Sequence, residues 1–265
     1  MSDLSDRIKA LNVPCYIKGP SSCQIAARIA QLLDEAEIPN VLWIGLAQHC
    51  HGVTGASLPD FVIPDHLIQP AYEKLLASGF FLCEEGEKCI QHKYPRLFLK
   101  SDRHVHTIAG EPRSVVHLYK KSGLLWRLPD FEMGPPAADD RHLMLSNDER
   151  LPPGQAVFGG SGPWPPSLYP VKIPTAACII ETYILLSCRD WDSDQNGYFS
   201  SWQMSLFRIL VEVQDKYFND EDLLPDFRPY WQTPAPGRNH KFFELRKKLM
   251  ESNELPPSPS WKSSN

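Results

Sequence analysis

The segment formed by residues 41–64 constrains the fold of this 265-residue chain more than any other. It contains two short apolar runs, 41–46 and 61–63, separated by a stretch rich in small residues. Short apolar runs bounded by turn residues are typical of buried strands rather than helices. The intervening residues 47–52 are sufficient for one or two helical turns. The segment therefore predicts a strand, a short helix and a second strand that begins near Asp60.

This arrangement resembles the opening of the nucleotidyltransferase fold, in particular the nucleotidyltransferase-like proteins common in fungi. In that family, glycines approach a triphosphate, and an Asp-x-Asp pair on the next strand holds the divalent metal ions that align the phosphates. The resemblance implies nucleotide-binding roles for Gly45 and Gly52 and a catalytic role for Asp60. Leu58 occupies the first carboxylate position and Pro59 follows it. Because leucine cannot ligate magnesium, we expect the fold without classical nucleotidyl transfer.

Two further blocks carry the same resemblance, which extends over residues 21–231. They are V-I-P-D-H-L-I-Q-P-A-Y-E-K-L-L-A-S-G-F at 62–80 and L-Y-P-V-K-I-P at 168–174, followed by I-I-E-T-Y-I-L-L-S-C-R-D-W at 179–191. Active members of the family often carry a third carboxylate on a later strand. On the strand expected at 114–119, the position that would serve is His117. The resemblance thus implies that a second metal-binding carboxylate is absent.

The predicted fold class is α/β (α+β), a mixed sheet flanked by helices with a C-terminal helical subdomain. We expect a core at 1–130, a Pro/Gly-rich connection at 131–174, helices at 175–250 and a disordered tail at 251–265. Periodicity predicts helices at 21–36, 66–78, 176–191, 198–217 and 242–250. Ser21, Asp65 and Thr175 are the predicted caps. Residues 83–106 are expected to be irregular, and 124–128 to form a short strand or a turn.

The overall composition favours a soluble cytoplasmic protein, and the resemblance implies a small-molecule or nucleotide ligand. The net charge of −5 argues against nucleic acid as the main partner, because phosphate binding normally requires a basic surface. No apolar run approaches the roughly 20 residues that span a bilayer, so we expect no membrane partner. The seven cysteines show no C-x-x-C pair, and no secretory signal is evident. Reduced thiols are therefore expected.

Three side chains are candidates for ligand chemistry in the implied cleft. His49 and His51 lie where the resemblance places the nucleotide, and a histidine there is suited to acid or base catalysis near neutral pH. Arg189 is a candidate for contact with a phosphate or carboxylate. The alternative for Arg189 is an ordinary ion pair at a helix end.

The sequence does not predict a metal site or a cofactor. His49 and His51 are nearly adjacent and have no second ligand pair at zinc spacing. His104 and His106 are expected to share a strand face, but nothing in the sequence pairs with them. The motif D-S-D-Q-N-G at 192–197 matches the start of a calcium loop. Its twelfth position is Gln203, which cannot chelate bidentately, so an ordinary turn is the alternative.

Three functions remain open from the sequence. The first is a non-catalytic relative that binds a small molecule or nucleotide in the cleft. The second is a biosynthetic enzyme, a transferase or cyclase, with metal-independent chemistry in the same cleft. The third is a magnesium-dependent nucleotidyltransferase whose carboxylates come from Asp102, Glu111, Asp139 or Asp140. The absence of the carboxylate pair disfavours the third function. A second carboxylate close enough to Asp60 to share a metal ion would favour it again.

Overall fold

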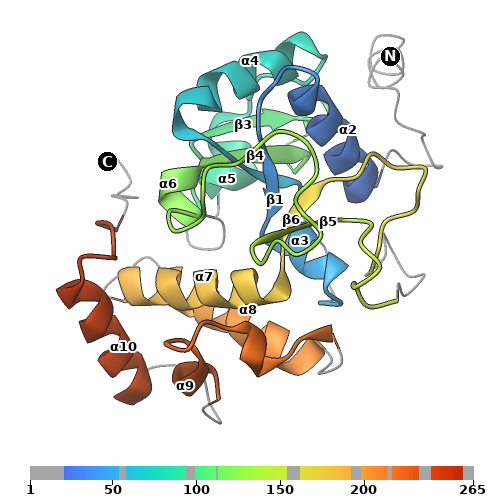
Figure 1. Cartoon of the computed structure of the whole chain (residues 1–265). Helices are drawn as coiled ribbons and strands as arrows, with labels where there is room; N and C mark the ends of the chain where they lie inside the picture. Colours follow the sequence, from blue (N-terminus) through green and yellow to red (C-terminus); the bar gives the residue numbers. More distant parts are fainter. Residues whose placement is uncertain are drawn as a thin grey trace.

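The structure is a computed structural model, and it describes residues 21–53, 58–93, 99–111, 113–153, 162–191, 198–213, 217–232 and 240–258. The fold is mixed α/β, with a four-stranded sheet and a separate two-stranded sheet. Figure 1 shows the four-stranded sheet between two groups of helices, with α2 and α4 on one side and α7 and α8 on the other. The α/β class expected from the sequence is therefore confirmed at this coarse level.

The four-stranded sheet combines parallel and antiparallel pairs. Its strands are β1 (Val41–Trp43), β2 (Asp60–Ile63), β3 (Arg103–His106) and β4 (Val115–Lys120), in the spatial order β1-β2-β4-β3. The central pair, β2 and β4, is parallel, whereas the two outer pairs are antiparallel. The register places Asp60 directly opposite His117, and His117 opposite His104. Three chemically active side chains are thereby brought to neighbouring positions.

In β1, β2 and β4, apolar side chains on opposite faces of the sheet belong to two different hydrophobic clusters, as the period of two requires. One face packs on α2 (Ser22–Asp34) and α4 (Ile68–Ala77). The other face packs on the C-terminal helices. The first face includes Leu42, Phe61, Ile63, Val116 and Leu118, and the second includes Val41, Trp43, Val62 and Tyr119.

The first helix of the described residues, α2, forms as its local sequence predicts, but the turn after β1 does not. Ser21 and Gln24 form a reciprocal capping box at the start of α2. The predicted strand at 41–46 ends at Trp43, and α3 (Gly45–Cys50) begins two residues later. The left-handed backbone conformation falls on Ile44, with φ 58° and ψ −131°, rather than on a glycine. The strand is shorter than predicted because the positive φ of Ile44 ends the extended conformation there.

The segment after β2 contains a 3₁₀ turn, η1 (Asp65–Leu67), before α4. The helix ends near Gly79, whose φ of +99° suits a residue past a helix C-terminus. The predicted capping role of Asp65 is wrong. Its carboxylate instead accepts a hydrogen bond from the backbone N–H of Ser122 at 3.0 Å, across to the next part of the fold.

Residues 83–106 are more regular than predicted. They contain η2 (Gly86–Lys88), α5 (Ile90–Lys93) and the strand β3. The strand was missed because its alternating side chains are Arg103, His104, Val105 and His106, of which only Val105 is aliphatic. At 124–128 the strand alternative is wrong, because α6 (Lys121–Leu124) runs into a turn.

The predicted connection at 131–174 also contains structure that helps to build the core. It supplies β5 (Leu143–Leu145) and β6 (Lys172–Pro174), which pair in the antiparallel sense. Trp164, Val171 and Ile173 are buried in the cluster that includes α2. Strand β6 packs against β1. These residues therefore attach the segment to the sheet rather than leaving it on the surface.

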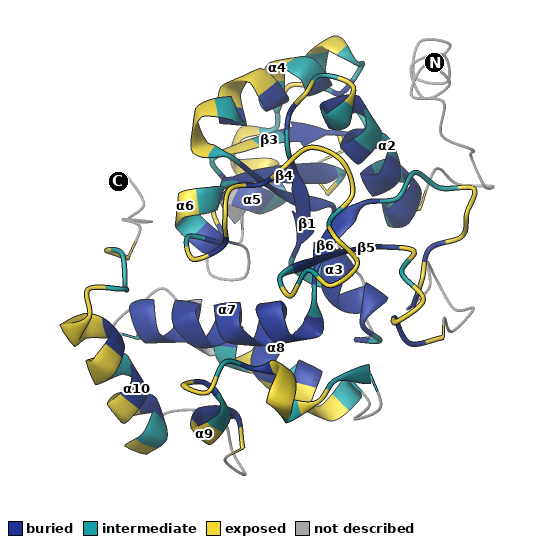
Figure 2. Cartoon of the chain, viewed as in Figure 1, coloured by how far each residue is buried: buried dark blue, intermediate teal, exposed yellow. Residues whose placement is uncertain are grey.

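The C-terminal part is helical, as expected, with α7 (Ala176–Arg189), α8 (Tyr198–Glu212), η5 (Asp220–Asp222), α9 (Arg228–Trp231) and α10 (His240–Glu251). Thr175 caps α7 by accepting from the backbone N–H of Cys178 at 3.2 Å. Helix α8 ends at Glu212, short of the predicted residue 217. Every residue of α7 is buried, as its continuous dark blue colour in Figure 2 shows.

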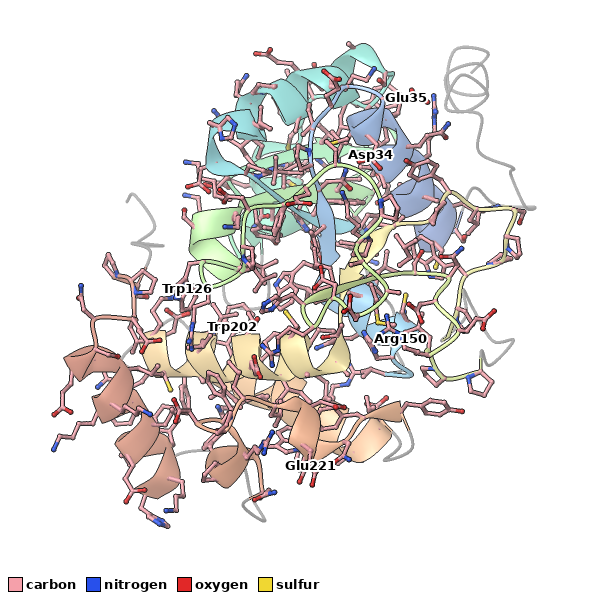
Figure 3. All side chains as sticks on the ribbon, viewed as in Figure 1. Asp34, Glu35, Trp126, Arg150, Trp202 and Glu221 are labelled. Atoms are coloured by element: carbon pink, nitrogen blue, oxygen red, sulfur yellow. The ribbon has the colours of Figure 1, made fainter. Side chains whose placement is uncertain are left out.

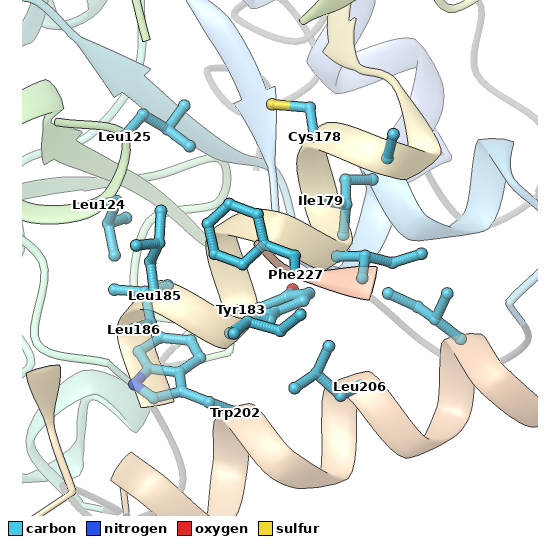
Figure 4. Close-up of a cluster of buried hydrophobic side chains, with 14 of the residues drawn as sticks. Leu124, Leu125, Cys178, Ile179, Tyr183, Leu185, Leu186, Trp202, Leu206 and Phe227 are labelled. Atoms are coloured by element: carbon cyan, nitrogen blue, oxygen red, sulfur yellow. The ribbon is translucent and has the colours of Figure 1, made fainter. Parts of the chain in front are cut away.

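Helix α7 is buried because it lies between the sheet and the other C-terminal helices. Figure 4 shows Tyr183, Leu186, Trp202, Leu206 and Phe227 from α7, α8 and the segment before α9 gathered in one cluster. The same cluster includes Trp43 of the sheet, whose ring centroid lies 5.5 Å from that of Tyr183. The C-terminal helices thus share a core with the sheet.

The described part of the tail, residues 251–258, makes hydrogen bonds to the rest of the fold. Ser258 Oγ donates to Asp190 Oδ1 at 2.7 Å, and the carbonyl of Glu254 accepts from Trp126 Nε1 at 3.1 Å. Residues 259–265 of the predicted tail lie outside the described residues. Within the described part of the chain, the helices are all too short or too polar to cross a bilayer.

Candidate functional site

Asp60 and His117 form a buried hydrogen-bonded pair at the centre of the sheet. Asp60 Oδ1 lies 2.6 Å from His117 Nδ1, and because a carboxylate accepts, the imidazole Nδ1–H is the donor. Burial raises the pKa of Asp60, while the hydrogen bond and charge of His117 act in the opposite direction. The other imidazole nitrogen, His117 Nε2, is buried without a hydrogen-bond partner in the described part of the chain.

This pair occupies the place where the resemblance implied metal-binding carboxylates. Within the described residues, neither Asp60 nor His117 belongs to a group of three or more convergent metal-ligating side chains. Magnesium requires several oxygen ligands in octahedral geometry, and a single buried carboxylate supplies too few. The arrangement is therefore suited to a structural pair or to proton transfer.

The other carboxylates named from the sequence have different surroundings. Asp102 accepts from the backbone N–H of Lys120 at 2.9 Å, and Glu111 from that of Arg113 at 3.1 Å. Asp139 and Asp140 line a cavity on another part of the molecule. The structure brings none of these four into a convergent ligand group with Asp60.

A cavity of ≈360 Å³ opens beside His51 and the first turn of α7. Its polar lining includes the carboxylates of Asp139, Asp140 and Asp222 and the guanidinium groups of Arg141 and Arg150. Its apolar lining includes Met144, Leu151 and Phe218. Figure 3 labels Arg150 near the start of α7. Both signs of charge and an apolar wall thus meet in one hollow.

The two cationic side chains of the cavity are held by carboxylates outside its lining. Arg141 Nη2 lies 3.0 Å from Glu181 Oε1, and Arg150 Nη2 lies 2.7 Å from Asp148 Oδ2. The hydrogen bond from Arg150 is the main reason why the pKa of Asp148 is lowered. These ion pairs orient the guanidinium groups before any ligand arrives.

Among Gly45, His49, His51, Gly52, Asp60 and Arg189, the residues predicted for the implied cleft, His51 is the one that lines this cavity. Its Nε2–H donates to the carbonyl of Pro174 at 2.8 Å, which fixes the ring beside the start of α7. Burial lowers the pKa of His51 to about 4, so the ring is neutral near pH 7. His51 therefore contributes an uncharged polar group of fixed orientation to the wall of the cavity.

His49 and the two glycines are placed differently from His51. His49 is buried and does not line the cavity, and burial lowers its pKa. Gly45 is the first residue of α3. Gly52 follows that helix with φ +97°, where a Cβ would meet Pro152 Cγ at 3.5 Å. Gly52 therefore has a clear backbone role in the turn.

Arg189 does not face a ligand site and is used inside the fold. Its Nε and Nη2 each lie 2.8 Å from a carboxylate oxygen of Asp190, and its Nη1 donates to the carbonyl of Gly123 at 2.6 Å. The guanidinium also lies over the ring of Trp126, 5.2 Å from its centroid. The structure thus shows the helix-end ion pair, and the contact with a phosphate or carboxylate ligand stays a prediction.

The fold brings two cysteines beside His104 and His106, for which the sequence offered no partner. Their ligating atoms lie within 4.8 Å of those of Cys83 and Cys89. The sequence signals were a C-x₅-C spacing and an H-x-H spacing. They were missed because the two pairs meet only when the chain after α4 folds back on β3. The possible calcium loop at 192–197 lies outside the described residues.

Comparisons of the chain with protein-family models, curated proteins and solved structures found no match. The function therefore has to be inferred from the geometry of the sites themselves.

Proposed function

We propose that this chain is a nucleotidyltransferase-like protein that binds a small polar molecule without magnesium-dependent nucleotidyl transfer. The cavity beside His51 supports the binding role most directly. Its volume of ≈360 Å³ falls at the lower end of the range of small-molecule sites, about 300–1,000 Å³. Its combination of an apolar wall with a few fixed polar groups is also typical of such sites.

The charges of the cavity favour a small zwitterionic or cationic molecule over a nucleoside triphosphate. Three lining carboxylates and two lining guanidinium groups give a formal balance of −1 with His51 neutral, and Glu181 and Asp148, which hold those guanidinium groups from outside the lining, make the surroundings more negative. A triphosphate without a metal ion would meet more negative than positive charge there. The ammonium group of a small ligand can bind a lining carboxylate, and its carboxylate or hydroxyl can bind a lining guanidinium group.

The surroundings of Asp60 support the second part of the proposal. Its close polar partner is His117, and a protonated Nδ1 offers a hydrogen bond but no lone pair to a cation. Asp60 and His117 also lie outside the cavity lining. Metal-independent acid–base chemistry at this pair is a second candidate function, favoured by the buried and unsatisfied His117 Nε2 within the described residues.

The test is a thermal-shift screen of the full chain against amino acids, polyamines, other small polar metabolites, and nucleotides with and without magnesium. We expect a zwitterionic or cationic compound to raise the midpoint and the Arg150→Gln variant to weaken that effect. The matched control is Arg113→Gln, because Arg113 is exposed and lies outside the cavity lining. Calorimetry then gives the affinity for each variant.

The binding role of the cavity and the absence of nucleotidyl transfer can each be contradicted by a different result. Equal binding by Arg150→Gln and wild type would remove the cavity from the proposal. Magnesium-dependent transfer of a nucleoside monophosphate, lost in Asp60→Asn, would restore classical nucleotidyl transfer. For the second candidate, turnover of a bound compound that survives His117→Gln unchanged would exclude the Asp60–His117 pair.

A further inference from the structure

The chain after α4 turns back and lies beside the outer strand of the sheet. Phe81 and His106 exchange two backbone hydrogen bonds, each of 2.8 Å, in an isolated antiparallel bridge. This bridge places Cys83 and the turn η2 next to β3. Cys89 follows η2 directly, so both cysteines return to the same edge of the sheet.

The two histidines meet these cysteines because of the strand period. His104 and His106 are two residues apart on β3, so their side chains project from the same face. Their ring centroids are 5.7 Å apart. Within the described ranges, Cys83, Cys89, His104 and His106 are the one set of three or more ligating side chains whose ligand atoms converge, all within 4.8 Å of one another.

The separations match the geometry of a tetrahedral metal centre. Cys89 Sγ lies 3.6 Å from His104 Nε2 and 3.7 Å from His106 Nε2. Zinc binds sulfur at about 2.3 Å and imidazole nitrogen at about 2.0–2.1 Å, which sets the sulfur–nitrogen edge of a tetrahedron at about 3.5 Å. The observed contacts therefore leave room for an ion of this size between the ligands.

The tautomer of His106 is suited to binding a cation. His106 Nδ1 lies 3.0 Å from the carbonyl oxygen of Glu111. A carbonyl only accepts, so Nδ1 carries the proton and Nε2 presents its lone pair towards Cys89. A hydrogen bond from the non-ligating nitrogen to a backbone carbonyl is the usual support of a metal-bound histidine.

We propose that Cys83, Cys89, His104 and His106 form a structural zinc site. Two thiolates and two imidazoles complete the four-coordinate set of a structural centre and leave no position for a substrate. Soft sulfur with imidazole favours zinc over magnesium or calcium. Cys89 is fully buried and His106 is 2% exposed, which shields the ion from solvent. Zinc would fasten the η2 turn to β3, the strand that carries His104 beside His117.

The first test measures zinc in the full chain, purified without an affinity metal, by inductively coupled plasma mass spectrometry. We expect one zinc per chain in wild type and near-complete loss in Cys89→Ser and in His106→Asn. The matched controls are Cys178→Ala and His66→Ala, which alter a cysteine and a histidine outside the cluster. Zinc retained in both cluster variants, or absent from wild type grown with added zinc, would overturn the proposal.

A second measurement uses only the wild-type chain, so it does not depend on how the variants fold. After exchange of zinc for cobalt(II), we expect the visible absorption of a tetrahedral ion with thiolate ligands. Cys83 is only partly buried, so alkylation should modify it after chelation and spare it in the zinc-loaded chain. A Cys83–Cys89 disulfide in freshly purified protein, or an octahedral cobalt spectrum, would refute the zinc site.

Discussion

Removing the carboxylate of Asp190 should destabilise the fold more than changing any exposed ion pair. Asp190 and Arg189 are 0% and 1% exposed at their side chains, and two bonds of 2.8 Å join them. Asp190 also accepts from Trp202 Nε1 at 2.9 Å and from Ser258 Oγ at 2.7 Å. One carboxylate thus joins the end of α7, helix α8 and the tail.

The expected cost follows from the charge that would be left behind. In Asp190→Ala the guanidinium of Arg189 stays buried without its counter-ion, and breaking a buried pair from one side costs about 3–5 kcal/mol. That is a large part of the roughly 5–15 kcal/mol that stabilises a typical domain. The double variant Arg189→Met/Asp190→Leu removes both charges and should lose less than Asp190→Ala.

Urea unfolding followed by tryptophan fluorescence measures these free energies of unfolding. The control is Glu251→Ala, which removes an exposed partner of Lys247 at 3.8 Å and should change the free energy by about 0.5 kcal/mol or less. A loss below about 1 kcal/mol in Asp190→Ala would refute the reasoning. Arg189→Met with unchanged stability but weaker ligand binding would instead restore the ligand contact predicted from the sequence.

Two further predictions concern His51 and Gly79. In the unfolded chain His51 binds its proton below about pH 6.5, whereas in the folded chain it does so only below about pH 4. Acidification from pH 6.5 to pH 4 should therefore lower the free energy of unfolding, by at most about 1.4 kcal/mol per pH unit. In urea titrations at a series of pH values, His51→Gln should reduce this dependence on pH, and an unchanged dependence would contradict the lowered pKa of His51. Gly79→Ala should lower the free energy of unfolding by about 1–2 kcal/mol, because an L-residue is strained at a φ of +99°. No atom lies within 4 Å of the added Cβ, so this cost comes from the backbone and not from a steric clash. Gly123→Ala, within α6 and equally unobstructed, is the control and should be neutral or stabilising. Equal thermal midpoints for the two alanine variants would contradict the backbone argument.

Features determined by neighbouring residues were predictable from the sequence, whereas features determined by distant contacts were not. Ser21 and Thr175 cap the expected helices because a cap needs only the next turn of chain. Asp65 has the same chemical character, yet the fold uses it to bind Ser122. Its role depended on a contact across 57 positions, which no local pattern reports.

The candidate site shows the same limit. The resemblance implied that His117 takes the position of a third carboxylate, and the parallel pairing of β2 and β4 places its Nδ1 2.6 Å from Asp60 Oδ1. It did not identify the partners of His104 and His106, because β3 lacks an aliphatic stripe and was expected to be irregular. The cavity was also missed, since it draws on five separate parts of the chain.

The sharing of the sheet between two cores has a consequence for synthesis of the protein. The strands β1, β2 and β4 leave the ribosome well before α7 does. Until α7 is available, the sheet face that carries Val41, Trp43 and Val62 lacks the C-terminal helices that pack on it. A chain whose translation stalls before residue 176 therefore exposes part of an apolar sheet face, and such a chain is prone to aggregate or to bind chaperones.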